Sequence, residues 1–248
     1  MKIIKEQYNR YGEEDYDIGY VNWGFDELDE QIIMAEKLEK LFPANTEKIL
    51  DVACGIGRYH QTWLKSNYCV TGIDLSETFI KFAKEYNKEY EKAKYIVCNF
   101  NDLDITNEFD VALWTDPVDL VGKPVNNIYK ALKTGGRFIY EMWNENFYKY
   151  HQRKVGQTWT CENDVYKLVK NQYNAATSTT ECEEIIFDVN NETMIYKKGF
   201  NAKNVNAHCS IQILKASGFK NIRFVDYEGK LFDPSDQNTK RFFMVGEK

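Results

Sequence analysis

The sequence predicts an α/β protein built around a mostly parallel sheet. Short apolar runs recur over residues 48–142 with helical patterns between them, and this alternation is typical of a parallel sheet with helices on both faces. From about residue 158 apolar and polar residues alternate instead, which predicts an antiparallel β insert. The chain has 248 residues, 43% of them apolar, which is enough to bury the core of a single domain.

The elements are expected in the following order. Apolar residues recur at helical spacing over 26–42, and Pro43 ends that first helix. Strands of the main sheet are then expected at 48–53, 69–74, 95–98, 109–114 and 137–142, with helices that end near residue 66 and span 76–90 and 125–132. A late helix over 210–216 ends at Gly218, and two final strands cover 222–227 and 241–245.

These elements divide the single domain, residues 1–248, into four parts. We expect an N-terminal helical cap at 1–45, a ligand-binding core at 46–142, an antiparallel insert at 158–198, and a closing helix with two strands at 207–247. Ligands of open α/β sheets bind at the carboxyl ends of the strands. The insert is therefore expected to be either a lid over that edge or an arm for dimerisation.

Charge and hydropathy argue against several classes of function. Lys and Arg number 32 against 38 Asp and Glu, a net charge of −6, whereas nucleic-acid-binding proteins carry clustered basic surfaces. No apolar run approaches the ~18 residues of a membrane-spanning helix. The start of the chain turns polar after Ile4, unlike a signal peptide. We therefore expect a cytoplasmic protein with no nucleic-acid or membrane partner.

The cysteines predict neither a disulfide framework nor a metal centre. All six are scattered, none forms a C-x-x-C pair, and none stands at metal-ligand spacing from the three histidines. In a chain of this length such cysteines are typically reduced thiols. No structural zinc site is expected.

The most informative segment joins the first strand to the helix after it. The strand ends at Asp51, a turn with Gly55 and Gly57 follows, and a helix begins. Glycines at such a turn let the backbone bend sharply and approach a ligand closely. The second strand ends at Asp74, 17 residues after Gly57, where a carboxylate suits the hydroxyls of a ribose.

Two details separate the ligands that this loop could hold. A nicotinamide dinucleotide fingerprint would place its third glycine at residue 60, which is His60 here. A carboxylate at Asp51 would repel a pyrophosphate but suits a positively charged ligand. S-Adenosylmethionine carries a sulfonium, an ammonium and a ribose but no phosphate, so it fits the loop better. A tight turn without a ligand is the remaining alternative.

The same residues resemble the class I S-adenosylmethionine-dependent methyltransferases that act on small molecules. Five segments are similar to motifs of that family. They are residues 51–58 (DVACGIGR), 72–76 (GIDLS), 132–138 (LKTGGRF, with Thr134 in place of proline), 214–219 (LKASGF) and 241–245 (RFFMV). The motifs occur in the family's order over about residues 47–247. The resemblance implies a Rossmann-like sheet of seven strands in the order 3-2-1-4-5-7-6.

The resemblance also implies a cofactor site for S-adenosylmethionine, with S-adenosylhomocysteine as the product. Asp51 would face the cofactor's ammonium, directly or through water, and Asp74 would hold the ribose. Asn99 stands where family members often carry an acid for the adenine amino group, and its amide carbonyl can still accept that hydrogen bond. The full candidate set is Asp51, Ala53, Cys54, Gly55, Gly57, Arg58, Asp74, Leu75, Asn99, Phe100, Trp114, Tyr20 and Trp23.

Several of these residues have a simpler alternative reading. Tyr20 and Trp23 precede the core, and they would either close over the cofactor or pack the first helix. His60 lies near the loop, where packing or a hydrogen bond beneath the loop is the favoured role.

Four residues are candidates for orienting or deprotonating the methyl acceptor. Asp116 and Asp119 lie in the loop after the fourth strand, which in this family passes beneath the transferred methyl. His151 follows the fifth strand, and His208 opens the late helix. The alternative role is that of a solvated or capping acid for the two aspartates and that of a surface residue for the two histidines. Asp116 begins a segment, DPVD, that only faintly echoes the motif of nucleic-acid amino methyltransferases.

The sequence therefore predicts transfer of a methyl group to an O or N atom of a small polar metabolite, with a carbohydrate as one candidate. A nicotinamide-dependent oxidoreductase and a non-catalytic S-adenosylmethionine-binding protein are the alternatives. The expected partner is the small-molecule acceptor, and the expected assembly is a monomer or a homodimer.

Overall fold

The computed structural model describes residues 28–115, 122–151, 157–162, 164–174, 179–190, 192–203 and 206–248. Its elements in chain order are α3 (Leu28–Glu39), β1 (Lys48–Val52), α4 (His60–Lys65), β2 (Cys69–Asp74), α5 (Glu77–Tyr86), β3 (Ala93–Val97), the 3₁₀ turn η1 (Phe100–Asp102), β4 (Phe109–Trp114), α6 (Gly122–Ala131), β5 (Leu132–Trp143), α7 (Glu145–His151), β6 (Gln157–Glu162), β7 (Val165–Asn174), β8 (Thr179–Asp188), β9 (Thr193–Lys203), α8 (Ala207–Ser217), β10 (Lys220–Val225) and β11 (Arg241–Glu247).

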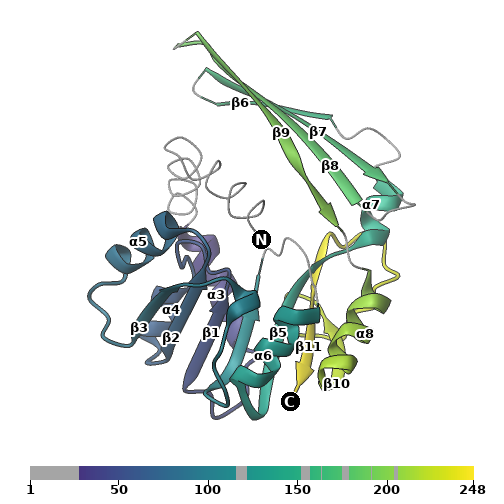
Figure 1. The fold of residues 1–248 in the computed structure, drawn as a ribbon. Helices are drawn as coiled ribbons and strands as arrows, with labels where there is room; N and C mark the ends of the chain where they lie inside the picture. Colours follow the sequence, from purple (N-terminus) through teal and green to yellow (C-terminus); the bar gives the residue numbers. More distant parts are fainter. Residues whose placement is uncertain are drawn as a thin grey trace.

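The main sheet confirms the fold class that the sequence predicts. Its seven strands lie in the order β3-β2-β1-β4-β5-β11-β10, which is 3-2-1-4-5-7-6 when only these strands are counted. Strands β1 to β5 pair in parallel, and β11 runs antiparallel to both β5 and β10. Figure 1 shows helices on both faces of this sheet. The carboxyl ends of the parallel strands therefore share one edge, and the loops at that edge are where ligands bind in open α/β sheets.

Local capping sets where the helices begin and end. The Ser76 side chain accepts from the backbone N–H of Phe79 at the start of α5, and Asn206 does the same for Cys209 at the start of α8. Gly218 ends α8 with φ of +102°, as the sequence predicts. Helix α7 was not expected, because seven residues are too few to show helical periodicity.

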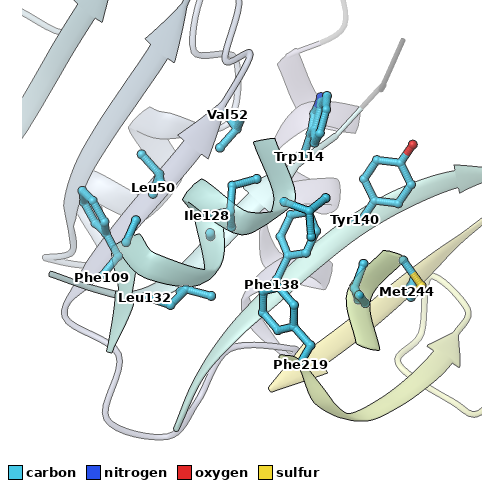
Figure 2. Packing of buried hydrophobic residues seen from close by; sticks show 14 of the residues in the cluster. Leu50, Val52, Phe109, Trp114, Ile128, Leu132, Phe138, Tyr140, Phe219 and Met244 are labelled. Carbon is cyan, nitrogen blue, oxygen red and sulfur yellow. The ribbon is translucent and has the colours of Figure 1, made fainter. Parts of the chain in front are cut away.

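Two apolar clusters cover the two faces of the main sheet. Figure 2 shows one of them, in which Phe138, Phe219 and Met244 pack with residues of β1, β4 and α6. The other joins α3 and α4 to the opposite face and includes Leu38, Trp63 and other fully buried side chains. Burial on both faces explains why the central strands have near-continuous apolar sequences.

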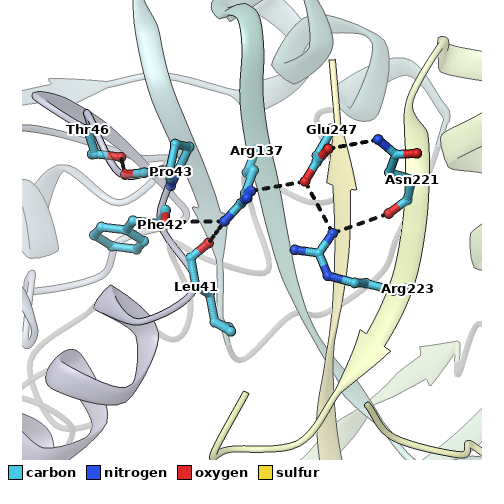
Figure 3. A network of polar contacts seen from close by, with 8 residues as sticks. All are labelled: Leu41, Phe42, Pro43, Thr46, Arg137, Asn221, Arg223 and Glu247. Carbon is cyan, nitrogen blue, oxygen red and sulfur yellow. Dashed lines mark hydrogen bonds and ion pairs between the residues drawn. The ribbon is translucent and has the colours of Figure 1, made fainter. Parts of the chain in front are cut away.

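A polar network at the opposite end of the sheet ties the last strands to α3 (Figure 3). The Arg137 side chain donates from Nη1 to the carbonyls of Leu41 and Phe42 at 2.9 and 3.2 Å, and from Nε to Glu247 at 3.2 Å. Arg223 also donates to Glu247, at 3.3 Å. The carbonyls after α3, left without helical partners, are thereby satisfied.

The insert is a separate four-stranded antiparallel sheet with the order β6-β7-β8-β9. Its strands extend to residue 203, beyond the expected 198. In Figure 1 it lies beyond the carboxyl-end edge of the main sheet. Tyr166, Phe187 and Met194 occupy paired positions on neighbouring strands and are 39%, 43% and 68% exposed. One face of the insert therefore carries an exposed apolar row.

Candidate functional site

The loop after β1 turns in a conformation that most side chains avoid. Ala53, Gly55 and Gly57 all have positive φ, at 56°, 55° and 71°. Alanine at such a φ carries strain of roughly 1–2 kcal/mol, and strained backbone of this kind is common at ligand sites. The loop is held by its own N–H groups, since Cys54 donates to the Ile73 carbonyl and Gly57 donates to the Cys54 carbonyl.

Asp74 closes the other side of the loop. Its Oδ2 accepts from the backbone N–H of Gly55 at 2.9 Å, and its Oδ1 accepts from the N–H of Ser76 at 2.9 Å. The side chain is buried. Each carboxylate oxygen keeps a further lone pair, so Asp74 shapes the loop and can still accept from a hydroxyl. Its role toward a ribose stays a prediction.

Asp51 and His60 meet beneath the loop. Asp51 Oδ2 lies 2.8 Å from His60 Nε2, and His60 Nδ1 lies 2.8 Å from the hydroxyl of Tyr95. Gly72 lies between Asp51 and Tyr95 in the strand register. The His60 ring is fully buried over that glycine. The hydrogen-bonding alternative for His60 is therefore the one that the structure shows.

Burial sets the protonation of the polar groups around this loop. Burial raises the pKa of the Cys54 thiol well above its usual value, and the carboxylates of Asp51 and Asp74 raise it further. Burial also raises the pKa of Asp74, although the hydrogen bonds from Ser76 and Gly55 act against it. The pKa of Tyr95 is raised in the same way, by burial first and by Cys54 and Asp51 second. Cys54 and Tyr95 therefore stay protonated, and Cys54 is no nucleophile.

The segment after β3 is built around Asn99. Its Oδ1 accepts from the backbone N–H of Asn101 at 2.9 Å and from the Asn101 side chain at 3.0 Å. Phe100 packs on Trp114 with ring centroids 5.1 Å apart, and Trp114 is only 2% exposed. For Asn99 to accept from an adenine, it must therefore release one of the Asn101 hydrogen bonds. The roles of Asn99, Phe100 and Trp114 toward a cofactor stay predictions.

A small pocket opens where β5 ends. It has a volume of about 220 Å³ and is lined by Trp143, Asn144, Glu145, Asn146, Asn206, Ala207, His208, Pro234 and Phe242. Asn144 is buried and donates to the carbonyls of Asp236 and Thr239, which holds this lining residue in place. His208 is exposed in the first turn of α8. It is the one candidate catalytic residue whose side chain is described, and it lines this pocket.

The side chains of the other three candidates are outside what the structure describes. Asp116 and Asp119 lie outside the described residues, as do Tyr20 and Trp23 of the cofactor set. His151 ends α7, where the backbone is described but the side chain is not.

One buried polar cluster at this edge was not expected from the sequence. Glu141 of β5 is 5% exposed and accepts from the Tyr227 hydroxyl and from Arg241, at 3.3 Å for the arginine. The guanidinium of Arg241 lies 3.6 Å from the centroid of the Trp143 ring. The three polar residues come from separate parts of the chain, so no local motif marks them.

The residues around the loop fit S-adenosylmethionine. Asp51 Oδ1 is buried and has no hydrogen-bond partner among the described residues, which leaves it an acceptor for an ammonium group. Asp74 keeps acceptor capacity on the neighbouring strand, where a ribose hydroxyl would donate. In the described part of the chain, no group of three or more His, Cys, Asp or Glu side chains is arranged to hold a metal ion.

Comparison with known proteins identifies the core. Residues 49–136 match the family model described as a methyltransferase domain. A ubiquinone biosynthesis O-methyltransferase of Coxiella burnetii is 27% identical over 126 residues, which are 48% of this chain and 53% of that protein. The chain thus spans about half the length of the curated relatives it matches.

Two solved structures show that the similarity of fold extends over nearly the whole chain. An S-adenosylmethionine-dependent methyltransferase from Clostridium acetobutylicum has a TM-score of 0.69 at 18% identity, covering 99% of this chain and 98% of that one. CalS10, an amino pentose methyltransferase from Micromonospora echinaspora solved with S-adenosylmethionine, has a TM-score of 0.63 at 17% identity, covering 98% and 96%. Residues 49–136 thus match a methyltransferase domain, and the strand order and the solved structures show that the chain has the fold of S-adenosylmethionine-dependent methyltransferases.

Proposed function

We propose that the chain transfers the methyl group of S-adenosylmethionine to an oxygen or nitrogen atom of a small polar metabolite. The observation that carries this proposal is the buried Oδ1 of Asp51 beside the loop after β1, which has no hydrogen-bond partner in the part of the chain that the structure describes. A buried carboxylate oxygen without a partner is costly, and the ammonium of the cofactor's methionine portion would satisfy it.

A nicotinamide dinucleotide suits the same loop poorly. The backbone N–H groups of Cys54, Gly55 and Gly57 already donate within the protein, so they are not free to bind a pyrophosphate. Asp51 adds negative charge beneath the loop. The side chain of His60 fills the space that a third glycine would leave open in a dinucleotide fingerprint.

The pocket at the end of β5 is our candidate for the acceptor site. It combines an aromatic wall, Trp143, with polar side chains from Asn146 and His208, a lining suited to a small polar molecule. A carbohydrate acceptor is consistent with this lining and with the amino pentose named for CalS10. An oxygen acceptor is consistent with the O-methyltransferase relative.

The reaction requires the protein mainly to position the methyl group and the acceptor atom. Bound S-adenosylmethionine supplies a methyl group that its sulfonium already activates. Transfer would form a bond from the acceptor's lone pair to the methyl carbon and break the carbon–sulfur bond, whose electrons would stay on sulfur. The chain must hold the two in line and near contact, and it must take a proton from a hydroxyl acceptor. We assign that task to Asp116, Asp119, His151 or His208.

The remaining parts of the proposal concern partners and location. None of the helices described is long and apolar enough to cross a membrane. We propose a small-molecule acceptor as the partner, a monomer or homodimer as the assembly, and a lid or dimer arm as the role of the β6–β9 insert. The described cysteines are free thiols, which is consistent with a reducing cytoplasm.

Calorimetric titration with S-adenosylhomocysteine, with NADH as the control ligand, tests the cofactor. One-to-one micromolar binding of S-adenosylhomocysteine alone is the expected result. Binding of NADH alone would overturn the proposal. Incubation with S-adenosylmethionine and a pool of small metabolites then tests catalysis, with S-adenosylhomocysteine release as the readout. Binding without any release from the pool would favour a non-catalytic cofactor-binding protein.

A further inference from the structure

The buried group formed by Asp51, His60 and Tyr95 is a chain of two hydrogen bonds. An Asp51 carboxylate accepts from His60 Nε2 over 2.8 Å. Burial raises the pKa of Tyr95, so its hydroxyl keeps a proton that it can donate to His60 Nδ1 over 2.8 Å. Each proton in this arrangement has a partner.

The strand register explains why these three residues meet. Asp51 of β1, Gly72 of β2 and Tyr95 of β3 are neighbours in a row across the sheet. A Cβ at Gly72 would lie 3.0 Å from both the His60 and the Tyr95 rings. The missing side chain therefore makes room for the imidazole to bridge two strands that do not pair with each other.

The packing holds the imidazole in one position. Its ring stacks on Tyr95 with centroids 5.4 Å apart and planes 20° from parallel. The loop after β1 also contacts the ring, since a Cβ at Gly57 would lie 2.6 Å from His60 Nδ1. The ring is thus confined between the ligand-binding loop and β3. The orientation of the Asp51 carboxylate follows from that of the ring.

This arrangement leaves one oxygen of the Asp51 carboxylate without a partner. In the described residues Oδ1 has no hydrogen bond, and neither a lysine nor an arginine is ion-paired with Asp51. Asp51 is 3% exposed, so water does not solvate its Oδ1 freely. A buried carboxylate in this condition favours a cationic ligand.

We propose that His60 and Tyr95 are positioning residues for the cofactor's ammonium. Together they fix the Asp51 carboxylate so that Oδ2 is engaged and Oδ1 remains available to the cation. The inference rests on the proposed function, because it assumes that the ligand of this loop is S-adenosylmethionine. It adds that His60 and Tyr95 set the affinity for the amino group through Asp51 and without contacting the amino group themselves.

The test compares two ligands that differ only in the amino group. One is S-adenosylhomocysteine, and the other is its analogue with hydrogen in place of the amino group. Calorimetry measures both Kd values for the wild-type protein, for Tyr95→Phe, and for His60→Gln as a second variant. Tyr68→Phe is the matched control, since the Tyr68 hydroxyl donates to the Glu39 carboxylate at 2.8 Å outside the loop.

Tyr95→Phe is expected to weaken S-adenosylhomocysteine binding about tenfold, the effect of one lost hydrogen bond to a charged system. The analogue without the amino group should bind this variant within about twofold of wild type, because it has no ammonium for Asp51 to hold. Tyr68→Phe should change neither Kd. His60→Gln is expected to show the same selective loss as Tyr95→Phe.

Other outcomes have separate meanings. Equal weakening of both ligands in Tyr95→Phe and His60→Gln would assign these residues a purely structural role and overturn the inference. No change in either ligand would overturn it as well. A wild-type protein that binds no S-adenosylhomocysteine would overturn the proposed function itself, and the inference with it.

Discussion

At the scale of single residues, the absent side chain of Gly72 organises the candidate site. A Cβ there would lie 2.7 Å from Cys54 Sγ, in addition to its close approach to His60. Both neighbours are buried and packed, so neither can move without disturbing the loop after β1. Gly72 therefore links the packing of the sheet to the geometry of the loop.

Gly72→Ala is expected to destabilise the protein by about 1–3 kcal/mol, because overpacking a filled core costs this much. Urea unfolding at neutral pH measures the change. Gly122→Ala serves as the control, since a Cβ at Gly122 meets nothing within 4 Å at the start of α6. If both variants unfold at the same urea concentration as wild type, the close packing around Gly72 is not present in solution.

The residues of the site could be predicted only where one segment carries them. Asp51, Gly55, Gly57 and Asp74 follow from the strand ends and the turn between them. The partners of His60 do not, because Asp51 and Tyr95 come together through strand register rather than local sequence. The same holds for Glu141, whose partners lie about a hundred residues away in the chain.

At the scale of elements, Asp110 joins three neighbouring strands at the end of the sheet opposite the site. Its Oδ2 accepts from the backbone N–H groups of Glu47 and Lys48 at 2.9 and 2.8 Å, and its Oδ1 accepts from Lys133 Nζ at 2.7 Å. Burial alone would raise the pKa of Asp110, but these hydrogen bonds and the Lys133 charge lower it below the ordinary value.

A lowered pKa in the folded state has a defined effect on stability. The contribution of Asp110 is fully present above the ordinary pKa of about 3.9 and is lost as the pH falls through its lower folded value. Asp110→Asn should therefore be less stable than wild type at pH 7, and the difference should shrink toward pH 3. Thermal unfolding across this range measures it, with Asp102→Asn at an exposed ion pair as the control. A stability difference between Asp110→Asn and wild type that does not change with pH would contradict its assignment to the charge of Asp110.

The end of α8 offers a second test at this scale. Gly218 has φ of +102°, and a Cβ there would lie 2.9 Å from the Tyr129 ring. Gly135 also has a positive φ, of 81°, but its Cβ would meet nothing within 4 Å. Both alanine variants carry the backbone strain of roughly 1–2 kcal/mol, so Gly218→Ala should cost more. Urea unfolding of the two variants checks this order, and equal losses would remove Tyr129 from the explanation.

Element boundaries could be predicted where a polar residue or a turn ends the apolar pattern of the sequence. The strands at 69–74 and 109–114 were predicted to the residue, because polar residues or turns flank their apolar runs. The helix expected over 76–90 ends at Tyr86 instead. Asn87 caps it, with its side chain donating to the Ala83 carbonyl at 3.0 Å, and periodicity alone does not reveal such a cap.

At the scale of the whole molecule, the main sheet and the insert differ in how they are held. The described strands β1, β4, β5 and β11 each contribute to both apolar clusters, so the two faces share one framework. Among the few side chains described in β6 to β9, none belongs to an apolar cluster, and the pairings of these strands stay within the insert. Elements that share buried apolar contacts open together, as one cooperative unit.

Amide hydrogen exchange is expected to separate these two parts. Amides of β1, β4 and β5 should exchange only through global unfolding, whereas those of β7 and β8 should exchange earlier through local opening. Adding S-adenosylhomocysteine should slow exchange in the loop after β1 and at the end of β2, where Asp51 and Asp74 lie, and leave β7 unchanged. Mass spectrometry of peptic fragments measures both effects. Protection that rises equally in the insert would instead show that the cofactor itself orders β6 to β9, and a lid would then be favoured over a dimer arm.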